Sequence, residues 1–241
     1  MHLMGVDVGT TGCKAVVFTE DGGVLGSGFR EYEITTDRTG RAEQDAEQVW
    51  EAVLEVMGEA SSRAGSGETG ALSISVQGDA VIPVDRDFRP LHPAVLGMDY
   101  RPEPQARACA RKLGDRELFR ETGMRPHPLN ALPKILWLRE NAPGAFCRVW
   151  KVTTYADYIM GRLGAGPVID YTMASRTMAF DLHERRWSAR ILDGVGLSEE
   201  LLSPAAPSGT RVGKLDREVA ERTGLSPQTM LVTGGHDQVC A

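Results

Sequence analysis

The chain has 241 residues, of which 41% are hydrophobic and 25% charged, and this composition is ordinary for a globular protein with a substantial buried core. Its net charge of −6 gives no electrostatic reason to expect nucleic acid or an anionic membrane as a partner. The sequence shows no apolar run of membrane-spanning length and no signal-peptide pattern, so we expect a cytoplasmic protein.

The first part of the chain predicts an antiparallel meander. Strand patterns cover residues 3–8, 14–19 and 24–34, and turns rich in glycine separate them at residues 9–12 and 21–23.

A helix is predicted next. Asp45 is a suitable N-cap, and Gln48 stands three residues on, as in a capping box. An apolar stripe at helical spacing then runs through Val49, Trp50, Val53, Leu54 and Met57. Residues 61–70 are rich in glycine and serine, so we expect a loop there.

Strands and helices alternate in the rest of the chain. Residues 71–76 have the pattern of a buried central strand. Further strands are predicted at residues 80–84, 151–153 and 230–233, and helices at 102–113, 132–140, 155–163, 188–194 and 216–223. This order predicts an α/β sheet of mixed strand direction. Whether residues 102–206 form a helical insertion or extend the same domain stays open.

The four cysteines are Cys13, Cys109, Cys147 and Cys240, and they include no C-x-x-C pair. We expect them to be reduced and buried. The five histidines do not stand at ligand spacing from them, so no zinc site is expected.

Two segments at opposite ends of the chain carry residues suited to chemistry. Asp7 ends an apolar run before a Gly-Thr-Thr-Gly turn, and Lys14 begins the next run. Backbone N–H groups, hydroxyls, a carboxylate and an ammonium around one point suit a nucleotide's phosphates and their Mg²⁺. In the alternative interpretation, Asp7 shapes the turn and Lys14 lies in solvent at a strand edge. A second aspartate, Asp237, follows two glycines and a histidine near the other end.

Five segments, in order, resemble the N-terminal domain of the FGGY carbohydrate kinases, the family of xylulokinase, gluconokinase and glycerol kinase. They are residues 7–14, Glu43-Gln44-Asp45 with Trp50, Asp99-x-Arg101, residues 132–138 and Gly234-Gly235-His236-Asp237. The resemblance covers essentially the whole chain. It implies an actin-like, ribonuclease H-like ATPase domain, which is an α/β fold with a mixed sheet and helices on both faces.

The resemblance also implies that two domains bind the two substrates, one the sugar and the other the nucleotide. Residues 1–241 would be the N-terminal, sugar-binding domain, and the C-terminal nucleotide-binding domain would be absent from this chain. Because ATP binds with the help of that second domain in the family, we expect weak or no activity from this chain alone. The sequence leaves a homodimer open.

Catalysis in the family needs a group that accepts the proton of the sugar hydroxyl, and the resemblance gives this role to Asp237. Interpreted from its tetrapeptide alone, Asp237 would instead cap a following helix. The resemblance makes Asp7 the ligand of Mg²⁺, directly or through water. It assigns the binding of the transferring phosphate of ATP to Gly9, Thr10, Thr11, Gly12 and Lys14.

The sugar pocket, by the same resemblance, is built on Gln77, Gly78 and Asp79, where relatives have Gln-Met-His or Gln-Arg-Glu. Asp79 offers a short, acceptor-only side chain to a sugar, or it is a turn residue between two strands. Asp99 either reaches the sugar or forms a structural ion pair with Arg101. The further substrate-contacting candidates are Asp99, Asn130 and Asp237.

Beyond Gly78 and Asp79, three further positions depart from the family pattern. Gly97 stands where many relatives have a pocket tryptophan, and Asn130 stands where they have an aromatic residue, so we expect a more polar or roomier pocket. His236 replaces a glycine beside Asp237. Its imidazole could tune Asp237 electrostatically, but a solvent-facing loop histidine is the favoured interpretation.

The predicted function is ATP-dependent phosphorylation of a carbohydrate hydroxyl, with a pentulose such as xylulose as the first candidate and a polyol or sugar acid as alternatives. A non-catalytic sugar-binding or regulatory module is the second hypothesis, motivated by the altered pocket residues. A chaperone-type actin-like ATPase is the third, and the segment 132–138 and the Gln77 turn argue against it.

Overall fold

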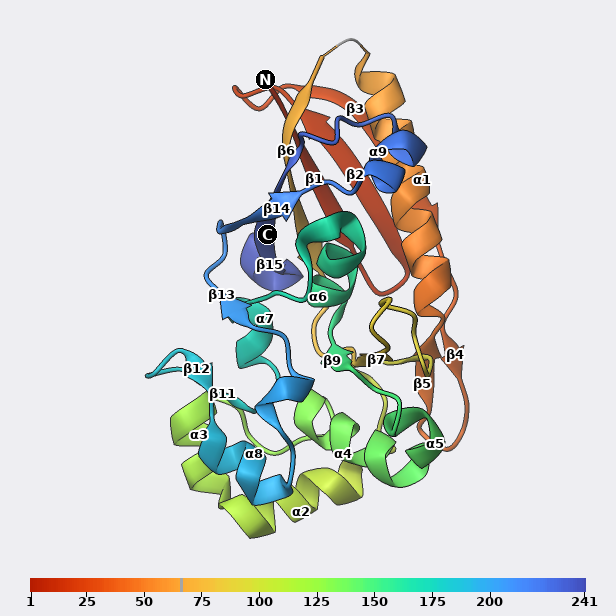
Figure 1. Ribbon diagram of the computed structural model, residues 1–241. Coiled ribbons are helices and arrows are strands. Elements are labelled where there is room, and N and C mark those ends of the chain that lie inside the picture. The colour runs from red at the N-terminus through yellow and green to blue at the C-terminus, as the bar shows by residue number, and fades with distance from the viewer. Residues whose placement is uncertain (66) are drawn as a thin grey trace.

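The computed structural model describes residues 1–65 and 67–241 (Figure 1). Its centre is a six-stranded sheet with the order β14-β15-β6-β1-β2-β3. The strands are β1 (His2–Val8), β2 (Gly12–Phe18), β3 (Val24–Glu31), β6 (Thr69–Val76), β14 (Arg211–Lys214) and β15 (Met230–His236). β1, β6 and β15 run parallel, whereas β2, β3 and β14 pair antiparallel with their neighbours. The predicted meander and mixed sheet are confirmed.

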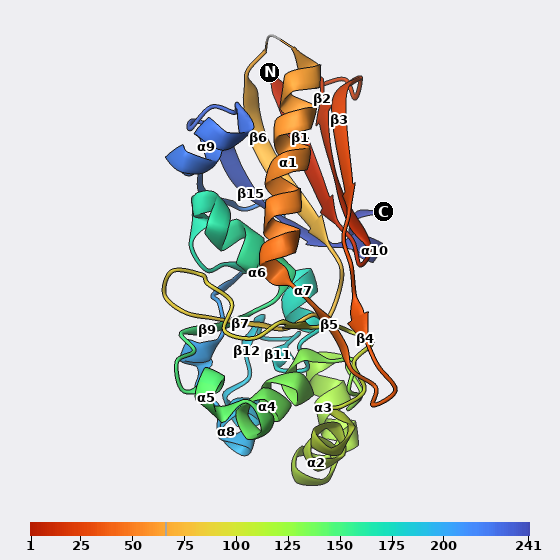
Figure 2. The ribbon, with the colours of Figure 1, turned by 90° about the vertical axis from the view of Figure 1, so that its right-hand side faces the viewer.

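One face of this sheet is covered by α1 (Ala46–Ala64), which lies along β2 and β3 (Figure 2). Because side chains alternate between the two faces of a strand, every second side chain of β1 and β2 lies on the face that α1 covers. The buried hydrophobic residues of these two strands are Met4, Val6, Val8, Cys13, Ala15 and Val17. Glycines on β3 allow the close approach, since a Cβ at Gly26 would lie 2.4 Å from the Ala60 carbonyl oxygen. α9 (Arg217–Thr223) packs beside α1.

The start of α1 agrees with the sequence prediction and its end does not. The Asp45 side chain accepts hydrogen bonds from the N–H groups of Glu47 and Gln48, as an N-cap does. The helix then continues to Ala64 because its last turns pack on β3, where Arg63 donates to the Ser27 carbonyl oxygen at 2.7 Å. The predicted loop over residues 61–70 is therefore too long at both ends, and its residue 66 lies outside the described residues.

A group of further helices lies beyond one end of the sheet, in the lower part of Figure 1, and we call α2 to α5 with α8 the helical lobe. They are α2 (Glu103–Leu113), α3 (Asp115–Thr122), α4 (Ala131–Asn141), α5 (Pro143–Phe146) and α8 (Ala189–Val195). Gly114 ends α2, and α8 follows its N-cap Ser188, the residue at which the predicted helix begins.

Short strands connect the helical lobe to the sheet. They are β4 (Thr35–Thr36), β5 (Ala42–Gln44), β7 (Ile82–Val84), β8 (Ala94–Val95), β9 (Lys151–Thr153), β10 (Ile169–Asp170), β11 (Phe180–Asp181), β12 (Arg186–Trp187) and β13 (Ala205–Ala206). A 3₁₀ turn covers Glu199–Leu201. One continuous cluster of buried hydrophobic residues joins sheet and lobe, so residues 102–206 pack as part of the same core.

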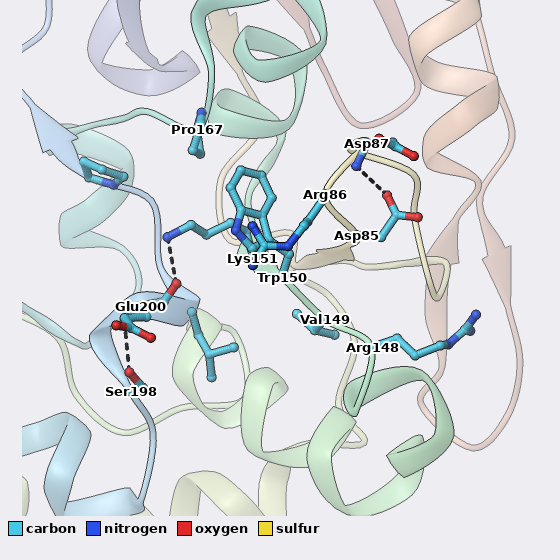
Figure 3. Close-up of a pocket in the computed structure, with 12 residues that line it drawn as sticks. Asp85, Arg86, Asp87, Arg148, Val149, Trp150, Lys151, Pro167, Ser198 and Glu200 are labelled. Atoms are coloured by element: carbon cyan, nitrogen blue, oxygen red, sulfur yellow. Dashed lines mark hydrogen bonds between the residues drawn. The ribbon is translucent and has the colours of Figure 1, made fainter.

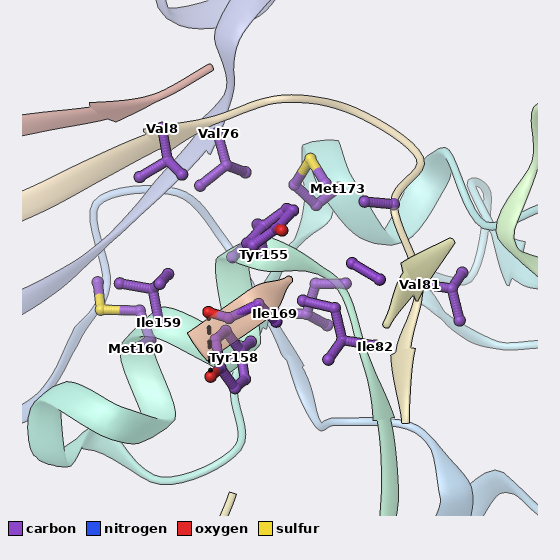
Figure 4. Packing of buried hydrophobic residues seen from close by; sticks show 14 of the residues in the cluster. Val8, Val76, Val81, Ile82, Tyr155, Tyr158, Ile159, Met160, Ile169 and Met173 are labelled. Carbon is purple, nitrogen blue, oxygen red and sulfur yellow. Dashed lines mark hydrogen bonds between the residues drawn. The ribbon is translucent and has the colours of Figure 1, made fainter. Parts of the chain in front are cut away.

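The junction between sheet and lobe is α6 (Tyr155–Met160), whose six residues are all buried. Figure 4 shows its side chains beside Val8 and Val76, the last residues of β1 and β6. A capping box between Thr154 and Asp157 starts the helix. The predicted helix over residues 155–163 also covers a π-helical turn, Gly161–Ala165, in which Gly164 takes a φ of 114°.

The C-terminal strand differs most from its prediction. The sequence places a strand at 230–233 and then a glycine turn, but β15 continues through Gly234 and Gly235 to His236. A Cβ at Gly234 would lie 1.6 Å from the Ile74 carbonyl oxygen. The glycine therefore allows β15 to approach β6 closely and does not form a turn. α10 (Asp237–Cys240) begins directly after the strand, and α7 (Tyr171–Ser175) packs against β15.

The predicted burial of the cysteines is right for Cys13 and Cys109 and wrong for Cys147 and Cys240, which are exposed. Burial raises the pKa of the Cys13 thiol to about 12 and that of Cys109 to about 11. The two exposed thiols lie at short helical turns, where the sequence pattern does not fix which side faces the core. Across the described ranges, no helix is long and apolar enough to cross a membrane.

Candidate active site

The parallel strands β1, β6 and β15 bring the two predicted acidic residues to one end of the sheet. Asp7 of β1 pairs with Ser75 of β6, and Ser75 pairs with Gly235 of β15. Adjacent strands are about 4.8 Å apart, so the backbones of Asp7 and Gly235 are separated by about 10 Å. Burial raises the pKa of the Cys240 thiol, and the nearby carboxylates, Asp7 and Asp237 among them, raise it further. Cys240 lines a surface depression together with Asp7 and belongs to the same short helix as Asp237, so both carboxylates lie near this thiol.

Hydrogen bonds within the turn and from neighbouring residues hold the Gly-Thr-Thr-Gly turn between β1 and β2 in place. The Gly9 N–H donates to the Gly12 carbonyl oxygen at 2.9 Å, and the Gly9 carbonyl oxygen accepts from the Tyr32 hydroxyl at 2.6 Å. Gln44 Nε2 donates to the Thr10 carbonyl oxygen at 2.9 Å. Within the described residues, the N–H groups of Thr10 and Thr11 have no acceptor. Free N–H groups in a fixed turn are suited to binding an anion.

Asp7 and Lys14 lie beside this turn as register partners of the β1–β2 pair. Both are exposed, and both line a depression of about 330 Å³ on the sheet face away from α1, together with Gly234 and Cys240. In the described part of the chain no three His, Cys, Asp or Glu side chains form a metal cluster. Mg²⁺ takes one or two carboxylates and completes its shell with phosphate oxygens and water, so the single exposed Asp7 carboxylate fits such an ion.

A second cavity, of about 510 Å³, adjoins the turn. Of the predicted site residues, its lining includes Thr10, Gln77, Gly78, Asp79 and Asp237. Residues to which the sequence gave no binding role, Tyr100, His127, Arg176 and Gln238, line it as well. The cavity has the size of a small-molecule site, and its wall combines polar and apolar groups. We call it the cleft cavity.

Asp237 is the first residue of α10, and its side chain is 39% exposed. Its Oδ1 accepts the Gln238 N–H at 2.7 Å and lies 3.3 Å from His236 Nε2. Its Oδ2 has no hydrogen-bond partner among the described residues. Asp237 lines the cleft cavity, as a base that accepts a hydroxyl proton must. The N-cap position of α10 belongs to His236, so Asp237 does not cap the helix.

The expectation that His236 faces solvent is wrong. Only 7% of its side chain is exposed, because β15 extends to this residue and turns the ring inward over Gly78. A Cβ on Gly78 would lie 2.4 Å from His236 Nε2. The register shift between Val232 and Gly235 breaks the alternation of side chains at the end of β15, so a longer strand prediction alone would not have placed the imidazole inside.

Arg176 is the main contributor to the cleft cavity that the sequence reasoning missed. Its Nε and Nη2 donate to Asp79 Oδ1 and Oδ2 at 3.2 and 2.7 Å, a bidentate pair. Asp79 has a φ of 68° and is nearly buried, while Arg176 is 29% exposed. The Asp79 carboxylate is thus occupied, and the pair presents guanidinium donors as well as acceptors to a ligand. The two residues are 97 positions apart, and no local motif links them.

Lys134 lies beneath the same wall. Its ammonium donates to the carbonyl oxygen of Asp79 at 2.8 Å and to that of Leu129. Because Lys134 is completely buried on α4, its contacts fix the backbone at Asp79 and at Leu129, and both of these residues line the cleft cavity.

Asp99, Asn130 and Gln77 were predicted to contact the substrate, but in the structure each binds other groups of the protein. Asp99 is fully buried, accepts the Ala42 N–H and binds Arg101, whose guanidinium lies 4.2 Å from the centre of the Trp137 ring. Asn130 is fully buried and donates to the Arg125 carbonyl oxygen. Neither lines the cleft cavity.

Gln77 does line it, but its Nε2 donates to the Gly9 carbonyl oxygen and to Gln44 Oε1, both at 3.2 Å. Its amide thus supports the Gly-Thr-Thr-Gly turn, residues 9–12, which we call the phosphate turn after its predicted role.

A larger hollow, of about 1030 Å³, lies elsewhere, beside β9 and the 3₁₀ turn (Figure 3). Arg86 and Trp150 line it, and the Lys151 ammonium there is bound by the carbonyl oxygens of Glu200 and Leu202. None of the predicted site residues borders this hollow. The candidate active site is therefore the cleft cavity with the neighbouring phosphate turn.

Comparison with known proteins agrees with this geometry. The chain matches the model for the FGGY family of carbohydrate kinases, N-terminal domain, over residues 2–241. It is 30% identical over 246 residues to the xylulose kinase of Lactococcus lactis subsp. lactis (strain IL1403), covering 100% of this chain and 48% of that protein. It is 29% identical over 238 residues to the gluconokinase of Bacillus subtilis (strain 168), covering 99% and 46%.

Among solved structures, the gluconate kinase from Lactobacillus acidophilus superposes with a TM-score of 0.91 at 26% identity, over 98% of this chain and 48% of that one. The actin-like fold, a mixed sheet with helices on both faces, is confirmed. The chain spans about half the length of these relatives. Its sequence over residues 2–241 and its fold show that it belongs to the FGGY family of carbohydrate kinases and contains the N-terminal domain of that family.

Proposed function

We propose that the protein catalyses ATP-dependent phosphorylation of a carbohydrate hydroxyl, and that residues 1–241 are the sugar-binding part carrying the catalytic base. The observation that carries this proposal is the shared border of the cleft cavity, where Thr10 of the phosphate turn and Asp237 both line one space. A hydroxyl bound there would lie between a proton acceptor and a phosphate-binding turn. Phosphoryl transfer needs this alignment more than it needs covalent chemistry from the protein.

In the proposed reaction, Asp237 Oδ2 accepts the hydroxyl proton as the sugar oxygen bonds to the γ-phosphorus and ADP leaves. The N–H groups of Thr10 and Thr11 hold the phosphoryl oxygens, and Lys14 offsets their charge. Asp7 would hold Mg²⁺, which when bound neutralises phosphate charge. The adenosine would be bound by groups outside this chain, which spans about half of its relatives.

For the acceptor, we propose a pentulose such as xylulose first, and a polyol or sugar acid as the alternative. The identity to a xylulose kinase supports the first and the identity to a gluconokinase supports the second. The Arg176–Asp79 pair supports a substrate rich in oxygen atoms. We propose the cytoplasm as the location, which suits four cysteines that are all free thiols.

A coupled ADP-release assay of the complete protein with pentuloses, polyols and aldonates tests the proposal. Replacement of Asp237 by Asn should lower kcat on the best acceptor by about 10²–10⁴-fold, the usual contribution of a general base. Thermal unfolding should be unchanged, because the Asp237 side chain is exposed.

Asp87→Asn is the control, since it alters an exposed carboxylate beside the larger hollow. Near-normal turnover by the Asp237→Asn protein would refute the role of this residue. Sugar binding without any turnover by the unaltered protein would favour the competing function, a non-catalytic binding or regulatory module.

A further inference from the structure

The contact between His236 and Gly78 connects two departures from the family pattern. The imidazole occupies the space directly above Gly78, at a distance where even a methyl group on residue 78 would overlap Nε2. Gly78 follows β6 and His236 ends β15, and these strands are adjacent in the sheet. The histidine ring therefore fills the volume that a longer side chain on residue 78 would otherwise take.

The same ring nitrogen lies close to the proposed base. His236 Nε2 lies 3.3 Å from Asp237 Oδ1, and both residues line the cleft cavity. The main chain fixes the ring's position, since the His236 N–H donates to Thr172 Oγ1 at 2.8 Å and its Cα is in register with Val76. A buried imidazole held in this way can orient a carboxylate that is itself partly exposed.

We propose that His236 is a positioning residue for Asp237, and that Gly78 is the companion glycine that makes room for it. His236 Nε2 lies 3.3 Å from Asp237 Oδ1, and in the proposed complex with the acceptor its N–H donates to that oxygen. The Gln238 N–H already donates to the same oxygen, so Oδ2 remains for the acceptor hydroxyl. The kinetic part of this inference rests on the proposed function. The packing part does not.

The kinetic test compares two replacements of similar bulk in the complete protein, on the best acceptor from the screen. Since a hydrogen bond to a charged group contributes about 1.5–3 kcal/mol, His236→Leu, which fills the space without donating, should lower kcat by at least about tenfold and leave KM little changed. His236→Gln, whose amide can donate, should retain clearly more kcat than the leucine variant. A leucine variant with normal kcat, or a glutamine variant that falls equally low, would overturn the positioning role.

A stability cycle tests the contact without any need for turnover. Gly78→Ala should lower the unfolding temperature when His236 is present, because the new Cβ must displace the ring. In the His236→Gly background the same change should have a much smaller effect. Equal shifts in the two backgrounds would show that the ring does not occupy this space and would overturn the inference.

The two measurements separate failure of the inference from failure of the proposed function. An unaltered protein that phosphorylates no acceptor in the screen contradicts the proposed function, and the stability cycle still decides whether Gly78 and His236 are companions. Turnover that is indifferent to His236→Leu contradicts only the inference.

Discussion

Lys134 shows how one buried charge can organise a site without reaching a ligand. Its ammonium is enclosed by α4 and by the segments around Asp79 and Leu129, whose carbonyl oxygens it binds. Burial lowers the pKa of Lys134 to about 7, although the carboxylates of Asp79 and Asp99 oppose the shift. In the unfolded chain the lysine keeps its ordinary pKa, so folding releases a proton over the range between the two values.

This linkage predicts a specific dependence of stability on pH. Between about pH 7 and 10 the unfolded state binds a proton that the folded state lacks, so the free energy of unfolding should rise with pH by up to about 1.4 kcal/mol per unit. Lys134→Met should remove this rise. Urea unfolding at several pH values measures the slope.

Lys112→Met, which alters an exposed lysine on α2, serves as the control and should leave the slope unchanged. A Lys134→Met protein with the unaltered slope would show that another group titrates in this range.

At the scale of elements, the close approach of β15 to β6 is the feature that brings Asp237 to the site. It depends on Gly234, whose position leaves no room for a side chain against the Ile74 carbonyl oxygen. The bulge between Val232 and Gly235 lies at the same place. Strand pairing here sets where the chain leaves the sheet and therefore where α10 begins.

Gly234→Ala should therefore lower the free energy of unfolding by about 3 kcal/mol or more, since backbone must move to admit the methyl group. Gly144→Ala is the matched control, because a Cβ there meets nothing within 4 Å and lies on the surface turn α5. That variant should be neutral or slightly stabilised. Chemical unfolding measures the free energy of unfolding of both variants. Similar values for the two would contradict the packing argument.

The elements also show what the sequence could and could not predict. Local signals located the N-cap of α1 at Asp45 and placed the starts of α8 and α9 within one residue, because an N-cap depends on adjacent residues. The same local signals misread Gly234-Gly235 as a turn, since the reason for those glycines is contact with β6, which is about 160 residues earlier.

Of the residues at the candidate site, the sequence likewise predicted some correctly and missed or misassigned others. The phosphate turn and Asp237 were found from motifs and from the family resemblance, and the structure brings them to one cavity. Arg176 escaped notice because its partner Asp79 is distant in sequence. Asp99 and Asn130 were expected at the sugar, but polar residues can also be buried with structural partners, and the sequence does not distinguish the two cases.

At the scale of the whole molecule, sheet and helical lobe share one core through α6. The Tyr155 hydroxyl on α6 donates to Gln44 Oε1 at 2.7 Å, and Gln44 in turn holds the Thr10 carbonyl oxygen of the phosphate turn. Hydrophobic packing and hydrogen bonds thus cross the junction together.

We therefore expect residues 1–241 to unfold in one cooperative transition. Hydrogen exchange at increasing urea, read by mass spectrometry on peptides from α1 and α4, should show loss of protection at the same urea concentration. Earlier loss in α4 would mean that the lobe is an independent unit.

The amide of Gln77 has a consequence for any ligand of this domain. It borders the cleft cavity on one side and binds the Gly9 carbonyl oxygen on the other. A molecule that displaces this amide also takes a support from the turn, and one that tightens the turn restrains the amide. By thermodynamic reciprocity, a ligand in the cleft cavity then changes the affinity of the turn for its ligand by the same factor by which a ligand on the turn changes the affinity of the cavity. One side chain is therefore enough to couple binding at the two places.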